Sequence, residues 1–272
     1  MSILEERSDF LAVFSEQILL FTCYAWMGWL CESIFCSICA KHWINRGFLY
    51  GPFCPVYAVG ALLSIYFLTP VSENWLLVFL LGTLITSAVE YFTGWLLETL
   101  FHAKWWDYSN HRFHLHGRIC LENCLIFGLM CLFLMEVLQP RILFLMHMIS
   151  PEIISWISVL LVVYFAVDTF FSSRNALRIR GKIEVLQGIL DEIRLQVHLA
   201  KDDIIDNLQE KLETLDNDTR QRAADLIARK NAAEKDLSAL SNRILKAFPK
   251  IQMQLPNARD ALDQLRKTLR RP

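Results

Sequence analysis

Long apolar runs alternate with short polar connections over the first two thirds of the chain. A helix needs about 20 mostly apolar residues to cross the hydrocarbon core of a bilayer. The pattern predicts five spans, over about residues 16–39, 52–68, 75–101, 119–138 and 153–171. The second run is short and begins with prolines, so a re-entrant segment is the alternative there.

The periodicity changes after residue 173. From Ile183 to Leu215 most apolar residues recur at alternating intervals of four and three, which is the spacing of a coiled-coil seam. The polar run 216–219 predicts a turn, and a second helix follows it until Pro249, with a shorter helix after Pro256. This pattern predicts an antiparallel helical hairpin, which would serve as a plain spacer, bind partner helices or mediate homo-oligomerisation.

Composition and charge divide the chain at the same place. Residues 1–173 contain all eight Trp and all eight Cys, with 7 Lys and Arg against 13 Asp and Glu, a net charge of −6. Residues 174–272 contain one aromatic residue, Phe248, and 20 basic against 15 acidic residues, a net charge of +5. We therefore predict an all-α protein, with a transmembrane helical domain at 1–173 and a soluble coiled-coil tail at 174–272. The mixed charges of the tail argue against nucleic acid as a partner.

Lys and Arg are concentrated in alternate connections between the predicted spans. The connections after the first, third and fifth spans carry Lys41, Arg46, Lys104, Arg112, Arg118, Arg174, Arg178, Arg180 and Lys182. The other side carries only Arg7 and Arg141. Because positive loops stay in the cytoplasm, we expect a multi-pass protein of the cell (inner) membrane, with its N-terminus outside and its tail cytoplasmic.

Five carboxylates lie in or at the ends of the predicted spans: Glu32, Glu90, Glu98, Glu122 and Asp168. An ionised group in a bilayer is costly and is usually retained for a function or a partner. Glu90 and Glu98 share one helix face with Thr83, Ser87 and Gly94, about 12 Å apart along it at 1.5 Å per residue. A similar stripe (Ala25, Gly28, Glu32, Cys36 and Cys39) follows the first span, and the two stripes could face each other. The alternative is ordinary helix packing with structural hydrogen bonds.

The predicted orientation brings carboxylates and arginines to the cytoplasmic face. Arg46, Asp107 and Arg118 lie in the adjoining loops, and Arg can pair with a carboxylate or hold an anionic ligand. Arg118 and Glu122 are four residues apart and could pair on one helix. Asp168 could snorkel to the interface or pair with the basic residues that follow it.

Metal and cofactor chemistry has little support in the sequence. A single CxxC, Cys36 to Cys39 with His42 nearby, is weak evidence for zinc, and we expect no metal site. The phosphate-loop, GxSxG, HExxH and GxGxxG motifs are absent, so we also expect no cofactor. The segment 105–109 (WWDYS) puts a carboxylate among aromatics, as either an interfacial anchor or a ligand clamp.

Five segments together resemble the bacterial membrane proteins of the Putative ABC-transporter type IV family. They are GWLCE at 28–32, NRGFLYGPFCPVY at 45–57, EYFTGWLLE at 90–98, WWDYS at 105–109 and GRICL at 117–121. The resemblance covers about residues 24–128 and excludes the tail. His114 departs from it, since the resemblance implies Asn there.

The resemblance implies a permease, which would also need a separate ATPase subunit. It matches the residues that we select as a substrate- or ion-binding site: Glu32, Arg46, Tyr57, Glu90, Glu98, Asp107, Tyr108 and Arg118. The leading interpretation is thus a transporter or transporter subunit in the lipid bilayer. The alternatives are a membrane-anchored scaffold or sensor that acts through the tail, and an intramembrane enzyme acting on a lipid or envelope precursor.

Overall fold

A computed structural model describes residues 3–206, with 225, 228–229, 231–233, 235, 247–248 and 252–253 of the remaining chain. The chain divides into two compact units. The first comprises Met1–Leu100, Lys104–Ser173 and Lys246–Ile251, and the second comprises Phe101–Ala103, Arg174–Leu245 and Gln252–Pro272. The expected turn at 216–219 and the helix after Pro256 lie outside the described residues.

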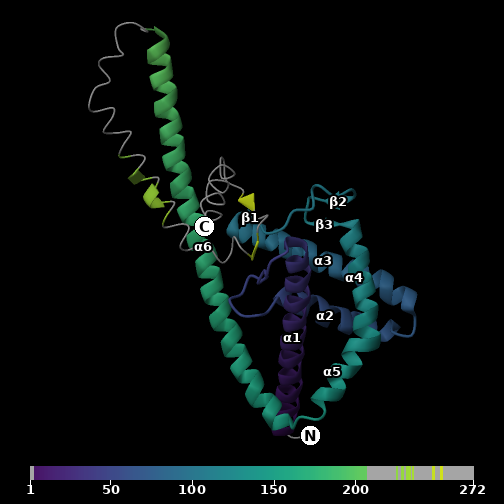
Figure 1. The fold of residues 1–272 in the computed structure, drawn as a ribbon. Coiled ribbons are helices and arrows are strands. Elements are labelled where there is room, and N and C mark those ends of the chain that lie inside the picture. Colours follow the sequence, from purple (N-terminus) through teal and green to yellow (C-terminus); the bar gives the residue numbers. More distant parts are fainter. Residues whose placement is uncertain are drawn as a thin grey trace. The chain divides into compact units, whose positions relative to one another are not determined.

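The described chain is mostly helical, as Figure 1 shows. The helices are α1 (Ile3–Ala40), α2 (Pro55–Leu68), α3 (Trp75–Phe101), α4 (Leu121–Phe133), α5 (Gln139–Met146) and α6 (Pro151–Asp206). A 3-10 turn, η1 (Thr69–Val71), follows α2, and a π-helical segment, η2 (Leu134–Leu138), joins α4 to α5. Pro140 lies in the first turn of α5 and lacks a backbone N–H, which explains why the regular helical bonding is interrupted just before it.

Four helices are long and apolar enough to span a membrane: Leu11–Ile38, Trp75–Phe101, Leu121–Met146 and Pro151–Lys182. Only 17–28% of each apolar window is buried inside the protein. Large apolar side chains such as Phe35, Leu84 and Trp156 are therefore exposed on the helix surfaces. An apolar surface of this extent fits a multi-pass membrane protein in contact with lipid.

The predicted second span corresponds to the short α2. Its 14 residues extend about 21 Å at 1.5 Å per residue, which is less than the hydrocarbon thickness of about 30 Å. Pro55 occupies the first turn of α2, where its missing N–H costs nothing. The sequence anticipated the other four spans, although the fourth extends to Met146 rather than ending near residue 138.

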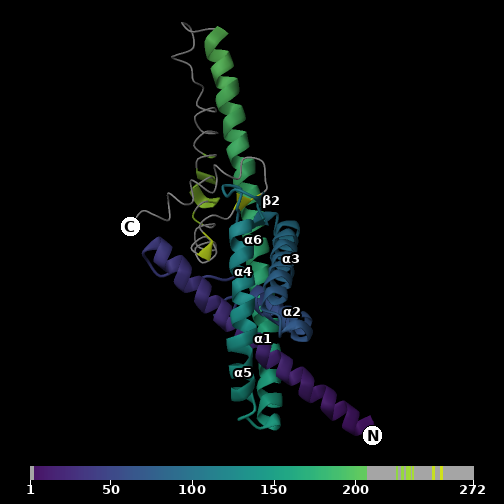
Figure 2. The same ribbon diagram turned by 90° about the vertical axis from the view of Figure 1, so that its right-hand side faces the viewer.

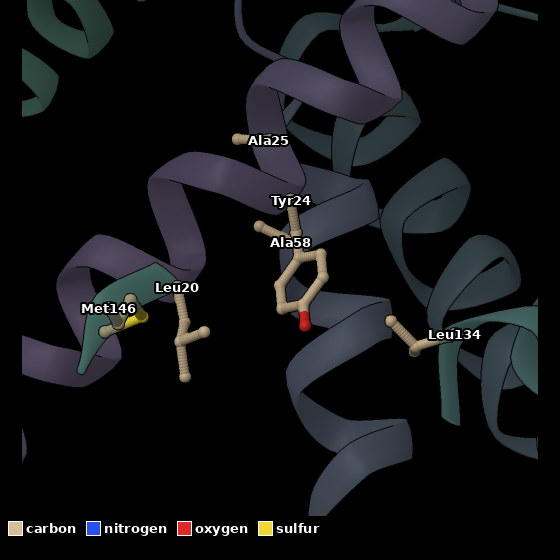
Figure 3. Close-up of a cluster of buried hydrophobic side chains, with 6 residues drawn as sticks. All are labelled: Leu20, Tyr24, Ala25, Ala58, Leu134 and Met146. Carbon is tan, nitrogen blue, oxygen red and sulfur yellow. The ribbon is translucent and has the colours of Figure 1, made fainter. Parts of the chain in front are cut away.

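The core of the first unit lies where α1 meets α2, η2 and α5. Leu20, Tyr24 and Ala25 of α1 are buried against Ala58 of α2, together with Leu134 and Met146 (Figure 3). The Tyr24 hydroxyl donates to the side chain of Gln139, so this buried phenol has a polar partner. Figure 2 shows α1 running obliquely to α4 and α5.

Glycines allow the close approaches between these helices. A Cβ at Gly28 of α1 would overlap the side chain of Tyr57, and one at Gly82 of α3 would lie 2.6 Å from the Cβ of Cys131. A Cβ at Gly128 of α4 would overlap the Thr83 hydroxyl. The small residues of the predicted stripes thus pack on α2 and α4 rather than on each other at these positions, as is common in membrane helix contacts.

Short strands connect the helices. β2 (His114–Leu115) pairs antiparallel with β3 (Ile119–Cys120), with His114 opposite Cys120. The tight connection requires positive φ angles of 54° at His116 and 70° at Gly117. A second pair joins β1 (Ala103–Lys104) to β4 (Gln252–Met253). These strands were not predicted, because two-residue strands leave no periodic signal.

The tail begins as a continuation of the last span. α6 is a single helix of 56 residues that passes from the apolar run into the coiled-coil pattern without a break. Of the expected second helix, the described residues between 225 and 235 are helical, and Asp225 and Arg229 form an ion pair of 2.8 Å. The coiled-coil pairing itself stays a prediction.

Candidate functional site

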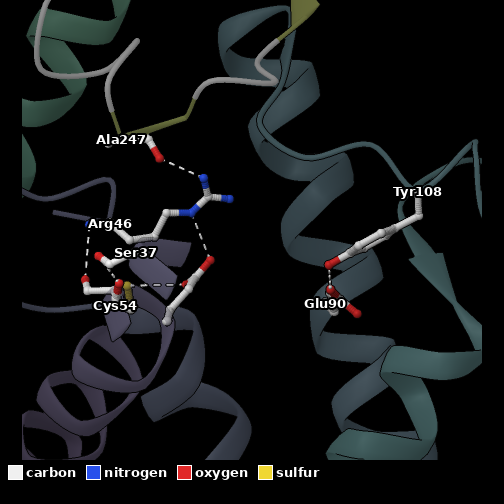
Figure 4. Close-up of polar contacts among 8 residues, drawn as sticks. Ser37, Arg46, Cys54, Glu90, Tyr108 and Ala247 are labelled. Carbon is white, nitrogen blue, oxygen red and sulfur yellow. Dashed lines mark hydrogen bonds and ion pairs between the residues drawn. The ribbon is translucent and has the colours of Figure 1, made fainter. Parts of the chain in front are cut away.

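The first part of the site is an ion pair between α1 and the loop after it (Figure 4). Arg46 Nε donates to Glu32 Oε1 over 3.0 Å, and the Arg46 backbone N–H donates to the hydroxyl of Ser33 over 3.1 Å. The other oxygen of Glu32 accepts the Cys54 thiol at 3.8 Å. Burial, and then the charge of Glu32, raise the pKa of the Cys54 thiol, so this cysteine stays a protonated donor.

The loop that carries Arg46 and Cys54 is attached at its other end to α6. The backbone N–H groups of Tyr50 and Gly51 donate to the two oxygens of Asp168 over 2.7 and 2.8 Å. The hydroxyls of Tyr164 and Ser172 donate to the same carboxylate over 3.2 and 3.0 Å. The expectation that Asp168 snorkels or pairs with the following basic residues is therefore wrong. Its carboxylate is buried and its neighbours are neutral donors.

The second part of the site is an ion pair between α3 and the loop before α4. Arg118 Nε and Nη2 both donate to Glu98 Oε2, over 2.8 and 2.5 Å, and Nη1 donates to the Tyr91 hydroxyl over 3.1 Å. Burial alone would lower the pKa of Arg118, but the hydrogen bond and charge of Glu98 raise it overall. The Arg118 side chain is therefore held in place on three of its nitrogen atoms.

Gly94, which lies next to this pair, leaves room for the side chains that pack on α3. A Cβ at Gly94 would lie 3.2 Å from the Trp106 ring and 3.6 Å from the Arg118 side chain. Trp106 Nε1 in turn donates to the Arg118 carbonyl over 2.9 Å. The WWDYS segment thus packs on α3 through Trp106.

Asp107 acts inside its own loop. Its Oδ1 accepts the N–H of Ser109 over 3.0 Å and the hydroxyl over 2.6 Å. A Cβ at Gly117 would come within 2.5 Å of that oxygen, and the Tyr108 N–H donates to the Gly117 carbonyl over 2.8 Å. The His114 ring accepts the Gly117 N–H at 3.2 Å. His114 stands where the family resemblance implies Asn, and it still supplies a hydrogen-bond acceptor at that position. These bonds give Asp107 the role of holding the loop.

The third part of the site is Glu90, which lies about one turn before Gly94 in α3. The hydroxyl of Tyr108 donates to Glu90 Oε1 over 3.0 Å (Figure 4). The other oxygen is buried, and no partner for it exists among the described residues. The same is true of the Ser87 hydroxyl, three residues earlier and so on the same face. Burial, and then the charge of Glu90, raise the pKa of Tyr108, which keeps that phenol protonated as a donor.

Two further predicted residues lie near Glu90. The charge of Glu32 acts on Glu90, and both carboxylates act on the hydroxyl of Tyr57. Glu32, Tyr57, Glu90 and Tyr108 are therefore electrostatic neighbours, although they come from α1, α2, α3 and a loop. Glu98 and Arg118 pair with each other, whereas Asp107 forms hydrogen bonds within its own loop.

The predicted pairing of Arg118 with Glu122 is wrong. α4 begins at Leu121, so Arg118 precedes the helix and its side chain turns to Glu98 instead. Glu122 is exposed and lies 3.1 Å from the ring of His111. A spacing of four residues pairs side chains only within one helix, and these two residues do not share a helix.

A comparison with models of protein families shows which family the chain belongs to. The model described as Putative ABC-transporter type IV matches residues 19–173, more than half of the chain. This protein belongs to the Putative ABC-transporter type IV family. The predicted resemblance is confirmed, and the match extends beyond the predicted 24–128 to include most of the last apolar span and Asp168. No curated protein and no solved structure matches the chain.

Family membership and the apolar helices together indicate a multi-pass, transporter-like membrane protein. The matched region contains all eight predicted site residues. The sequence did not point to Ser33, Cys54 or Asp168 as partners within the site, nor to Ala247 and Phe248 near its loop. Cys54 and Tyr50–Gly51 did lie inside a quoted motif, so the resemblance carried that signal without showing what each residue contacts.

Proposed function

We propose that this protein is the membrane subunit of a transporter and that it binds a small monovalent cation at Glu90. The supporting observation is the balance of charges. Glu32 is paired with Arg46, and Glu98 is paired with Arg118. Glu90 is in no ion pair among the described residues, and one of its buried oxygens has no hydrogen-bond partner there. Asp168 also lacks a cation in that part of the chain, but four neutral donors satisfy its carboxylate.

The surroundings of Glu90 suit a cation more than an anion. Its free oxygen and the Ser87 hydroxyl lie on one face of α3 and could both ligate a cation. Tyr57 adds a hydroxyl, while Tyr108 orients the carboxylate through the other oxygen. Both arginines already bind carboxylates, so neither offers an anionic ligand an uncommitted charge.

The remaining residues of the predicted site then have positioning roles. Arg46 fixes the position of Glu32, whose charge acts on Glu90, and the Glu98–Arg118 pair fixes the loop that carries Tyr108. A transported cation must be attracted to its site and must also be able to leave it. A second carboxylate such as Glu32, already paired with an arginine, would attract the cation without binding it tightly.

The cellular setting is part of the same proposal. The positive loops support a location in the inner membrane, with the N-terminus outside and the tail in the cytoplasm. The family description is that of ABC transporters, so we propose that a separate ATPase subunit provides the energy. Homo-oligomerisation through the tail is a further prediction of its coiled-coil pattern.

The test is cation-dependent stability of the purified full-length protein in lipid nanodiscs. Thermal unfolding is followed in NaCl or KCl, with choline chloride keeping the ionic strength constant. At a cation concentration about 100 times Kd, the wild type should gain about 2.7 kcal/mol. Glu90→Gln should remove the gain. Glu98→Gln, the matched control on the same helix, should lower stability yet retain the cation response.

The outcomes separate the functional classes. If neither Na⁺ nor K⁺ stabilises the wild type, the cation site is refuted. If Glu90→Gln only melts earlier and deletion of the tail abolishes the cellular phenotype, the protein is a scaffold or sensor that acts through its tail. An altered lipid fraction on overexpression would instead indicate an intramembrane enzyme.

A further inference from the structure

Two residues near the end of the chain belong to the first compact unit. Ala247 and Phe248 lie within Lys246–Ile251, which is grouped with the membrane helices rather than with the rest of the tail. Both are buried, with relative exposures of 2% and 7%. Phe248 is the one aromatic residue after position 173, so its burial is a specific feature of an otherwise polar tail.

The contacts of these two residues converge on Arg46. Its Nη1 donates to the Ala247 carbonyl over 2.7 Å (Figure 4), and its guanidinium carbon lies 4.4 Å from the centre of the Phe248 ring. The Phe248 ring also meets Trp105 edge-on, with centroids 4.8 Å apart. Trp105 packs in turn on Phe48, at 5.2 Å.

Arg46 is thus held from two sides by different parts of the chain. Its Nε donates to Glu32 of α1, and its Nη1 donates to the carbonyl of Ala247, which lies in the tail 201 positions later in the sequence. The aromatic face of Phe248 favours the charged guanidinium, and the contact is stronger because both groups are largely removed from water. Removal of Phe248 would allow the Arg46 guanidinium other rotamers and so weaken its ion pair with Glu32.

We propose that Ala247–Phe248 is an intramolecular latch, through which the tail holds Arg46 against Glu32 and so regulates the carboxylate site. With the latch closed, Arg46 neutralises Glu32. With the latch open, Glu32 joins Glu90 as a second carboxylate, and the site attracts a cation more strongly. The regulatory part rests on the proposed cation site, whereas the docking of the latch does not.

The docking is tested by hydrogen exchange of the full-length protein in nanodiscs. Phe248→Ala should speed exchange of the amides in 44–54 by about tenfold or more, because cation–π and charge-assisted contacts are each large enough to shift an opening equilibrium by such a factor. The matched control is Phe113→Ala, which removes the same ring from a loop position that is 79% exposed. Phe248→Leu, which retains an apolar side chain without the ring, should give an intermediate effect and serves if Phe248→Ala fails to fold.

Equal exchange rates at 44–54 in the Phe248 and Phe113 variants would overturn the latch. The regulation is judged separately, from the NaCl or KCl concentration that gives half of the thermal stabilisation. Phe248→Ala should lower that concentration severalfold, and an unchanged value in a variant with faster exchange would refute the regulation. A wild type that shows no cation response would refute the proposed function, while the exchange comparison would still judge the latch.

Discussion

Asp168 provides the strongest test of how the site's loop is held. Asp168→Ala removes four acceptor contacts at once, including those to the N–H groups of Tyr50 and Gly51. A hydrogen bond to a charged group contributes about 1.5–3 kcal/mol, so loss of the two backbone bonds alone should cost about 3–6 kcal/mol. Asp168→Asn retains one acceptor oxygen and should cost roughly half as much.

The measurement is thermal unfolding in nanodiscs, with hydrogen exchange of the Tyr50 and Gly51 amides as the local readout. A change of 1 kcal/mol moves Tm by about 2–4 °C in a domain of this size, so Asp168→Ala should lower Tm by roughly 10 °C. The control is Glu122→Ala, whose carboxylate is exposed and pairs only with a histidine ring in the described structure. If Asp168→Ala melts with the control and leaves the two amides protected, the loop is held by other contacts and the reasoning fails.

Two further predictions concern packing and pH. Gly28→Ala should destabilise by about 1–3 kcal/mol in thermal unfolding, because its Cβ would overlap Tyr57. Gly60→Ala, where a Cβ meets nothing within 4 Å, should be neutral or stabilising, and equal losses would contradict the packing argument. Because burial and Glu90 raise the pKa of Tyr108, its share of the stability is present below about pH 10 and is lost as the pH rises further. Tyr108→Phe should therefore weaken the fall of Tm between about pH 10 and pH 12, and an unchanged slope would show that Tyr108 does not titrate with unfolding.

The hydrophobic pattern was sufficient to locate the long helices. Apolar runs over 75–101 and 153–171 reappear within α3 and α6, because helix length in a membrane is set by the bilayer rather than by detailed packing. The short α2 was the ambiguous element in the sequence, because an apolar run of its length fits a buried helix as well as a membrane span. The continuity of α6 across residue 173 was missed, because a change in composition does not require a break in a helix.

The partners of the charged residues were harder to predict. Spacing along one helix suggested Arg118 with Glu122, yet Arg118 lies before α4 and reaches Glu98 of α3. Asp168 seemed to belong with the basic residues that follow it, yet it binds backbone amides about 118 residues away in sequence. Contacts of this kind depend on which helices pack together, and local periodicity contains no information about that.

The sequence by itself determined that this protein is helical and membrane-embedded and that it belongs to the Putative ABC-transporter type IV family. It also identified the polar residues that are candidates for the site. A carboxylate in an apolar run is conspicuous whatever the fold, because its desolvation cost is a property of the residue and the bilayer. Only the tertiary structure decided which of those carboxylates are neutralised. Glu32 and Glu98 meet arginines from distant loops, while Glu90 meets a tyrosine and has one oxygen without a partner in the described chain. Neutralisation depends on distances of a few ångströms between segments far apart in sequence, and those distances exist only once the helices have packed.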